Sequence, residues 1–145
     1  ASRITFFNGL AEDLQAECKK ADEFIRSFGG IDIAVLGLGR NGHLGFNEPG
    51  ADVSSGAHVV DLQEITQQAG LTYFGEVRDL RKGITLGLRS LLESRSIFLL
   101  VNGKHKAHIV KQVIQDPLSP LIPGSLLQEH DNCYVYLDRE AAEFV

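Results

Sequence analysis

The sequence predicts an α/β fold in which an open, mostly parallel sheet is flanked by helices in three layers. Short, nearly continuous apolar runs at 31–36 and 96–103 have the length and composition of buried parallel strands. Segments with helical apolar spacing, 11–28 and 104–116, alternate with these runs, as is typical of a parallel sheet. At 145 residues, 43% of them hydrophobic, the chain has the size of a single α/β domain, residues 1–145.

The N-terminal helix is predicted over 11–28. Its apolar residues recur every three or four positions, which places them on one helix face. They are Leu14, Cys18, Ala21, Ile25 and Phe28. Gly29 and Gly30 end this helix, because glycine adopts the left-handed conformation that terminates helices. The run 31–36 follows, and its consecutive apolar residues predict a strand buried on both faces.

The middle of the chain continues the alternation of strands and helices. A weaker strand is predicted over 57–62 and a short helix over 62–70. A further helix covers 85–95, with Thr85 as its N-cap. The strand 96–103 comes directly after this helix.

The C-terminal part completes the pattern. An apolar helical face runs through 104–116, and the proline-rich stretch 117–124 is a connection. A helical turn is predicted over 125–130, a strand over 133–138 and a terminal helix over 139–145. The sequence shows neither an internal repeat nor an interdomain linker.

Composition excludes several classes of partner. The net charge is -5 without a long basic run, which argues against nucleic acid as a partner. No window approaches the roughly 18 apolar residues that cross a bilayer, so a membrane partner is not expected. Cys18 and Cys133 are expected to be buried and reduced, and they form no metal-binding pattern. These features predict a cytoplasmic protein.

The loop 36–50, "LGLGRNGHLGFNEPG", contains a glycine pattern that binds dinucleotides in other proteins. The pattern G-x-G-x-x-G is formed by Gly37, Gly39 and Gly42. Asp61 even lies at the distance at which that motif places an acidic residue. However, the motif needs a helix that opens at its third glycine. Pro49 and the glycines and turn-forming residues around it leave no room for one, which argues against a nucleotide site.

The same loop favours acid–base chemistry. Asn41, His43 and Glu48 follow the carboxyl end of a predicted buried strand, where α/β proteins bind ligands. Histidine exchanges protons near neutral pH, and a nearby carboxylate orients its ring and raises its pKa. Gly39 and Gly42 let the backbone approach a ligand and donate N–H groups to it. The alternative is a surface histidine beside an ordinary turn; a metal site at His43 lacks further histidines in the loop.

The stretch "GGIDIAVLGLGRNGHLGFNEPG" (29–50) resembles the signature of the glucosamine-6-phosphate deaminase/isomerase family, whose relatives include the 6-phosphogluconolactonases. The resemblance extends through "FFNGLAEDLQAEC" (6–18), "VNGKHKAHIV" (101–110) and "SLLQEHDNCYVYLDREAA" (125–142). The ending "FNEPG" favours the amino-sugar branch. The resemblance implies a Rossmann-like three-layer fold. It also implies an enzyme that opens the ring of an amino-sugar 6-phosphate, isomerises aldose to ketose and releases ammonia.

The resemblance also implies roles for individual residues. His43 would be the acid–base group for ring opening, Glu48 would orient it, and Asn41 would hold it by hydrogen bonding. Lys106, in "GKHKA", would bind the phosphate, with Gly39 and Gly42 in the substrate-binding loop. A cation at the start of a helix is otherwise unfavourable, and a bound phosphate would relieve that conflict. Neither an organic cofactor nor a catalytic metal is implied.

The sequence departs from the family pattern in two ways. The family's upstream phosphate loop and "DE" motif, which supplies the isomerisation base, are absent, so we expect the C-terminal portion of a longer sugar-phosphate isomerase. Such a portion would lack the first strands of the sheet and have little turnover. The arginine that glucosamine-6-phosphate deaminases carry near 67–75 is also absent, with Arg78, Arg81 or Lys82 as candidate replacements.

The substrate and the assembly state are open at this point. The segment 81–92, "RKGITLGLRSLL", resembles the galactosamine-6-phosphate branch, so galactosamine 6-phosphate is slightly favoured over its gluco epimer. The alternatives are a 6-phosphogluconolactonase-like hydrolase and an inactive sugar-phosphate sensor. A homo-oligomer is compatible with the sequence.

Overall fold

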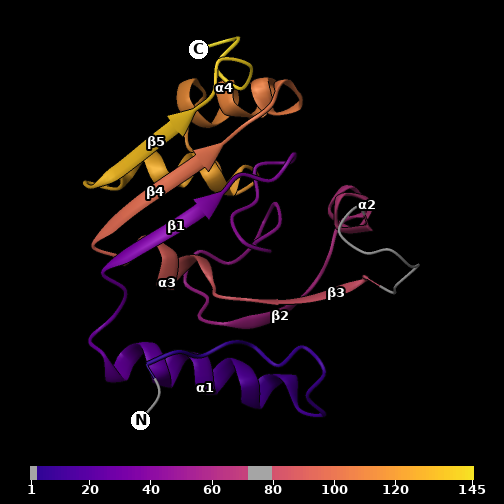
Figure 1. Cartoon of the computed structure of the whole chain (residues 1–145), viewed down its shortest axis with the longest axis vertical. Helices are drawn as coiled ribbons and strands as arrows, with labels where there is room; N and C mark the ends of the chain where they lie inside the picture. Colours follow the sequence, from indigo (N-terminus) through magenta and orange to yellow (C-terminus); the bar gives the residue numbers. More distant parts are fainter. Residues whose placement is uncertain (1–2, 72–79) are drawn as a thin grey trace.

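The computed structural model describes residues 3–71 and 80–145, and its centre is a three-stranded parallel sheet. The strands are β1 (Ile33–Gly37), β4 (Ser96–Val101) and β5 (Cys133–Leu137), in the spatial order β1-β4-β5 (Figure 1). Ile33 pairs with Ser96, and Ile97 pairs with Cys133. The carboxyl ends of the three strands therefore lie along one edge of the sheet.

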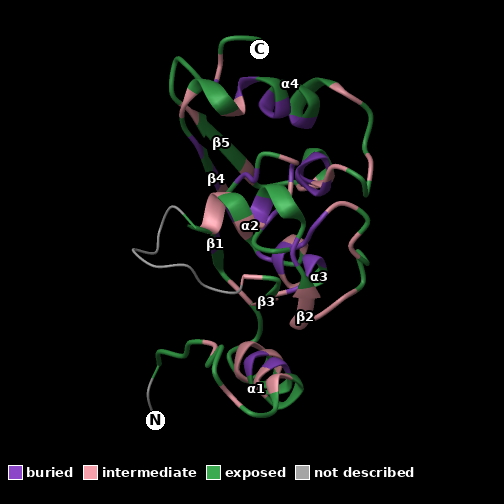
Figure 2. Ribbon diagram, turned by 90° about the vertical axis from the view of Figure 1, so that its right-hand side faces the viewer, coloured by how far each residue is buried: buried purple, intermediate pink, exposed green. Residues whose placement is uncertain are grey.

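One face of this sheet carries the core. Alternate residues of a strand point to opposite faces, and Ala34, Ile97 and Leu99 are among those that are buried. They pack with apolar residues of α3 (Leu88–Leu92), α4 (Ala107–Gln115) and the 3-10 helix η2 (Pro123–Glu129). Figure 2 shows buried residues on α3 and α4. The predicted α/β sheet with flanking helices is thereby confirmed.

The opposite face of the sheet is exposed in this structure, which corrects the expectation that the strand 31–36 is buried on both faces. Val35 is 65% exposed and Tyr136 is 55% exposed. Phe98 stacks between Tyr134 and Tyr136, with ring centroids 5.2 Å and 6.2 Å apart. The reason lies in the tertiary arrangement, because α1 (Leu14–Ser27) packs beside a separate two-stranded sheet instead of on this sheet (Figure 1).

The separate two-stranded sheet consists of β2 (His58–Asp61) and β3 (Lys82–Thr85), which pair antiparallel. The strand 57–62 and the short helix 62–70 are confirmed, the latter as α2 (Glu64–Leu71). The strand β3 was not predicted from the sequence.

The predicted N-cap at Thr85 is wrong. Thr85 is the last residue of β3, and Gly87 is the N-cap of α3. The hydroxyl of Thr85 accepts the N–H of Phe46 and donates to the carbonyl of Leu86, so it is not available to cap a helix.

The C-terminal part also differs in detail from the prediction. The predicted helix 104–116 begins as the 3-10 helix η1 (Lys104–Lys106) and continues as α4. The predicted helix 139–145 is wrong, since these residues form turns. The carboxylate of Asp138 accepts the N–H groups of Ala141 and Gly103, which holds this segment against the start of η1.

The expected burial of the two cysteines is only partly observed. Cys18 is buried, whereas Cys133 is only half-buried, and both are free. Burial raises the pKa of both thiols. None of the helices in the described residues is long and apolar enough to cross a bilayer.

Gly87→Ala should destabilise the fold strongly. A Cβ at this position would overlap the backbone carbonyl oxygens of Ser55 and Gly56, which cannot swing aside as a flexible side chain would. We expect the free energy of unfolding to fall by about 3 kcal/mol, at the upper end of typical overpacking effects. Urea denaturation measures this as a lower midpoint.

Gly9→Ala is the matched control, because a Cβ at Gly9 meets nothing within 4 Å. Equal midpoints for the two variants would show that the loop 54–56 does not pack against Gly87 as described.

Candidate active site

The loop after β1 folds back on itself at the carboxyl edge of the sheet. The N–H of Gly39 donates to the carbonyl of His43 (2.9 Å), and the N–H of Gly42 donates to the carbonyl of Gly39 (3.1 Å). Residues 38–57 are all described, and they contain no helix. The loop therefore lacks the helix N-terminus at the third glycine that a dinucleotide site requires.

Gly39 and Gly42 serve different purposes in this loop. The imidazole of His43 lies over Gly39, in the space that a Cβ would occupy. Gly42 has a φ of 84°, which favours glycine, and it is buried against Ile122. Its carbonyl accepts the N–H of Gly124 at 2.8 Å. Gly39 lines the cavity described below, whereas Gly42 packs against Ile122 and is not part of the cavity lining.

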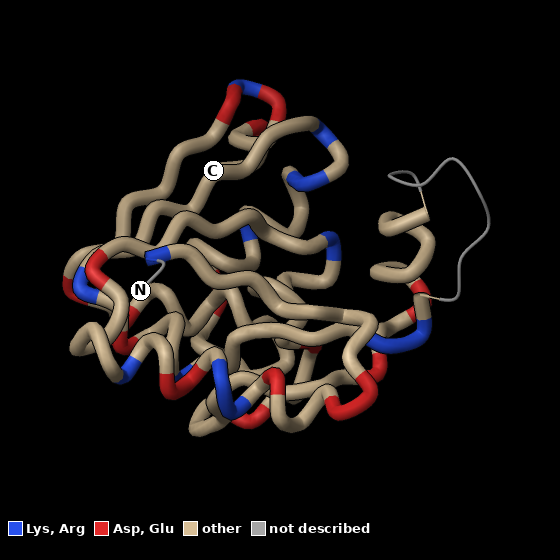
Figure 3. The backbone as a smooth tube through the Cα atoms, turned by 60° about the horizontal axis from the view of Figure 1, so that its bottom comes forward, with Lys and Arg blue, Asp and Glu red and all other residues tan. Residues whose placement is uncertain are grey.

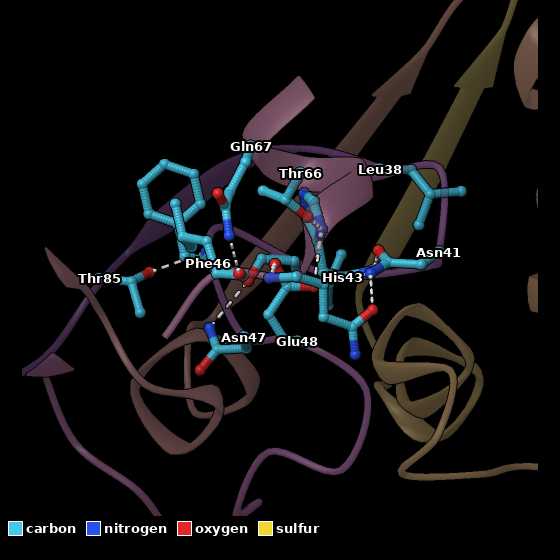
Figure 4. A network of polar contacts seen from close by, with 12 residues as sticks. Leu38, Asn41, His43, Phe46, Asn47, Glu48, Thr66, Gln67 and Thr85 are labelled. Carbon is cyan, nitrogen blue, oxygen red and sulfur yellow. Dashed lines mark hydrogen bonds and ion pairs between the residues drawn. The ribbon is translucent and has the colours of Figure 1, made fainter. Parts of the chain in front are cut away.

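His43 and Glu48 lie together, as the sequence predicts. Nδ1 of His43 is 3.5 Å from Oε2 of Glu48, whose side chain is largely buried. The hydroxyl Oγ1 of Thr66, on α2, lies 3.3 Å from the same nitrogen. Figure 4 shows these side chains converging from the loop and from α2. Among the described residues, none is hydrogen-bonded to Nε2 of His43, which is the nitrogen left for a ligand.

Asn41 hydrogen-bonds to Glu48 as well as to His43. Its Nδ2 donates to Oε2 of Glu48 at 2.7 Å and to Oε1 of Gln63 at 2.8 Å. Its Oδ1 accepts the backbone N–H of His43 at 3.3 Å, and no bond to the imidazole is formed. Asn41 therefore holds the carboxylate that faces the histidine, and its hydrogen bond to His43 is made with the backbone of that residue. The N–H of Gln63 supports the other oxygen, Oε1, at 3.2 Å.

The protonation of His43 differs from the simple expectation for a histidine beside a carboxylate. Burial lowers its pKa from the ordinary value of 6.5, while Glu48 raises it and Lys106 lowers it further. The net direction is downward, because the cost of burying the charged ring outweighs the attraction of the carboxylate. The imidazole is therefore neutral at pH 7 and able to accept a proton.

A cavity of about 940 Å³ opens beside the histidine. Lys106, at the end of η1, lines it together with Arg40, and its ammonium group donates to the carbonyl of Leu38. Burial and the charge of Arg40 lower the pKa of Lys106. Neither cation has a carboxylate within ion-pair distance among the described residues. Lys106 and Arg40 therefore supply positive charge to the cavity that an anion would neutralise.

This positive charge is local to the cavity. Figure 3 shows Lys and Arg scattered among Asp and Glu along the described backbone. Lys82 also lines the cavity, Arg81 lines a different one, and Arg78 lies outside the described residues. Within the described part of the chain, no group of three or more His, Cys, Asp or Glu side chains is placed to hold a metal ion.

Three residues of the site were missed by the sequence analysis: Arg40, Gln63 and Thr66. Gln63 and Thr66 lie about 20 positions after His43, and nothing in their spacing distinguishes them from surface residues of a short helix. Arg40 lies inside the loop, and its position directly before Asn41 was the available signal.

The fold and the site define a class of protein. It is an α/β protein with a largely buried histidine–carboxylate pair at the carboxyl edge of a parallel sheet, beside a cationic cavity. Residues 3–136 match the family described as "Glucosamine-6-phosphate isomerases/6-phosphogluconolactonase". The chain belongs to this family.

Individual relatives agree with this assignment. Glucosamine-6-phosphate deaminase 1 of Bacillus subtilis (strain 168) is 44% identical over 142 residues, covering 97% of this chain and 59% of the relative. The glucosamine-6-phosphate deaminase of Streptococcus equi subsp. zooepidemicus (strain MGCS10565) is 45% identical over 136 residues, covering 93% of this chain and 58% of the relative.

Solved structures give the same picture. A monomeric glucosamine-6-phosphate deaminase superposes with a TM-score of 0.91 at 43% identity, covering 96% of this chain and 58% of that one. A 6-phosphogluconolactonase from Trypanosoma brucei superposes with a TM-score of 0.64 at 19% identity, covering 94% of this chain and 57% of that one. The second likeness shows the fold alone. This chain thus spans just under three-fifths of the length of these relatives.

Proposed function

We propose that this chain carries the ring-opening site of an amino-sugar-6-phosphate deaminase/isomerase, with His43 as its acid–base group. One observation carries the proposal: Thr66 and Glu48 face Nδ1 of a neutral, buried His43, while Nε2 is left for a ligand beside a cationic cavity. Such a ring has one nitrogen for orientation and one for proton exchange, as a general acid–base group requires.

The proposed step is a proton relay on the sugar ring. Nε2 of His43 removes the proton of the C1 hydroxyl, the C1–O5 bond breaks, and C1=O1 forms. The same imidazolium then donates the proton to O5, which becomes the C5 hydroxyl. Glu48 stabilises the transient imidazolium, and Asn41 and the N–H of Gln63 hold the carboxylate in place.

We propose Lys106 as the phosphate-binding cation, with Arg40 beside it and the backbone of Gly39 at the cavity wall. A phosphate dianion would relieve the repulsion between the two cations. We also propose that Gly42 contributes through the shape of the loop, since it packs against Ile122.

Lys106→Met should weaken the binding of the phosphorylated sugar. The methionine keeps most of the apolar stem but removes the charge, so we expect the dissociation constant to rise about tenfold or more, as for loss of a charged hydrogen bond. Calorimetric titration with glucosamine 6-phosphate measures this. Lys104→Met is the control, because Lys104 pairs with Glu143 outside the cavity; equal weakening by both variants would contradict the assigned subsite.

Glucosamine 6-phosphate is the proposed substrate. The relatives described above are named for this sugar, and the earlier preference for the galacto epimer finds no support in them. The two epimers differ in the orientation of one hydroxyl. An enzyme discriminates between them when the wrong epimer leaves a buried polar group of the site unpaired. We place the reaction in the cytoplasm, where free thiols such as Cys18 and Cys133 persist.

The function is tested by following anomer interconversion of glucosamine 6-phosphate by exchange NMR, because this interconversion passes through ring opening. The chain should accelerate it, and the galacto epimer should respond less. Ammonia release is expected to be low from these residues alone, because the family resemblance places the isomerisation base outside them. Faster hydrolysis of 6-phosphogluconolactone would indicate a hydrolase instead. Tight sugar binding without ring opening would indicate a sensor.

A further inference from the structure

Thr66 brings a hydroxyl from α2 to the catalytic histidine. The side chain is almost completely buried, at 7% exposure, and its Oγ1 lies 3.3 Å from Nδ1 of His43. Among the described residues this is the contact that the hydroxyl makes. A buried hydroxyl without a partner is costly, so its position beside the imidazole has an energetic reason.

The direction of this hydrogen bond follows from Glu48. An ionised carboxylate only accepts hydrogen bonds, and its Oε2 lies 3.5 Å from the same Nδ1. The nitrogen that faces it therefore carries the proton. Thr66 Oγ1 faces the same N–H and must act as an acceptor, which leaves the lone pair on Nε2, toward the ligand.

The distances show why Glu48 alone does not hold the ring. Its two oxygens already accept Nδ2 of Asn41 at 2.7 Å and the N–H of Gln63 at 3.2 Å. Its separation from Nδ1, 3.5 Å, is longer than the 3.3 Å between Nδ1 and Oγ1 of Thr66. The charged groups that act on the pKa of the imidazole are Glu48, which raises it, and Lys106 of η1, which lowers it.

We propose that Thr66 is a positioning residue, which accepts the Nδ1–H of His43 and thereby fixes the orientation and tautomer of the imidazole. For its catalytic consequence this inference rests on the function proposed above. The start of α2 is bound to the same loop, because the N–H of Gln63 donates to Glu48 and Nε2 of Gln67 donates to the carbonyl of Leu62. Hydrogen bonds thus connect the segment that carries Thr66 to the carboxylate of Glu48.

Two substitutions separate the hydroxyl from the rest of the side chain. Thr66→Val keeps the branched shape and removes the acceptor, whereas Thr66→Ser keeps the hydroxyl. We expect Thr66→Val to slow anomer interconversion about five- to twentyfold at saturating sugar, with little change in half-saturating concentration, and Thr66→Ser to stay within about twofold. Thr85→Val is the control for a merely structural loss, since Thr85 is also buried and bonds only backbone groups.

The decisive readout is made without sugar, by ¹⁵N NMR of the histidine side chains in the unliganded chain. The wild type and Thr66→Ser should show a protonated Nδ1 and an unprotonated Nε2 for His43, with a slowly exchanging Nδ1 proton. Thr66→Val should lose that slow exchange, while Thr85→Val should keep it. An unchanged Nδ1 proton in Thr66→Val would overturn the inference. Absence of ring opening in the wild type would instead overturn the proposed function, while leaving this spectroscopic result standing.

Discussion

His43→Gln is expected to slow the proposed ring opening of glucosamine 6-phosphate by about 10²- to 10⁴-fold, the usual contribution of a general acid–base group. Glutamine retains a polar side chain of similar length but cannot exchange a proton near neutral pH. Anomer interconversion at saturating sugar measures the loss. Binding of the open-chain sugar should change little, because the phosphate subsite at Lys106 is left intact. Equal rates for variant and wild type would remove His43 from the mechanism.

The pH dependence provides an internal control for this variant. Burial lowers the pKa of His43 below 6.5, so the neutral imidazole persists at pH 7 and activity should decline only as the pH falls through that lowered value. The unfolded chain binds a proton at His43 near pH 6.5, before the folded chain does. The free energy of unfolding should therefore decrease as the pH falls through this window and level off below the folded pKa. His43→Gln should lack both effects.

Gly39→Ala is expected to reduce ring opening by about 10²-fold, because a small misplacement of a catalytic group has effects of that size. A Cβ at Gly39 would overlap three ring carbons of His43, namely Cγ, Cδ2 and Cε1. The imidazole must then turn away from Thr66 and Glu48. The same ¹⁵N spectrum that reports on Thr66 should show the loss of the protected Nδ1 proton.

Gly37→Ala is the matched control for this substitution. Gly37 lies two residues earlier and also lines the cavity, but a Cβ there meets nothing within 4 Å. We expect near wild-type activity from it. If both alanine variants lost activity equally, the effect would come from the flexibility of the loop and not from the space under the imidazole.

The elements with strong local patterns were predictable. Leu14, Cys18 and Ala21 recur at helical spacing, and their helix is present as α1. Ile97, Leu99 and Val101 supply a strand pattern that β4 confirms. In contrast, β3 has four residues, one of them glycine, and depends on pairing with β2. Such a strand is stabilised by its partner more than by its own residues, so its sequence alone could not predict it.

In the candidate site too, contacts between residues close in the sequence were predictable, whereas contacts between distant segments were not. His43 and Glu48 are five positions apart within one glycine-rich loop, so their proximity could be predicted from the sequence. Thr66 and Gln63 come from a different segment, and only the placement of α2 over the loop brings them to the histidine and its carboxylate. The direction of the pKa shift was equally unpredictable, since it depends on how deeply the ring is buried.

The sequence by itself determined the fold class, the family and the loop that carries the proposed acid–base pair, because these depend on local periodicity and on residues close together in the chain. Only the tertiary structure decided which groups hold the imidazole, which protonation state burial favours, and that Asn41 holds Glu48 as well as the backbone of His43. The physical reason is that hydrogen bonding and desolvation depend on distances of a few ångströms between distant segments, and packing alone sets these distances.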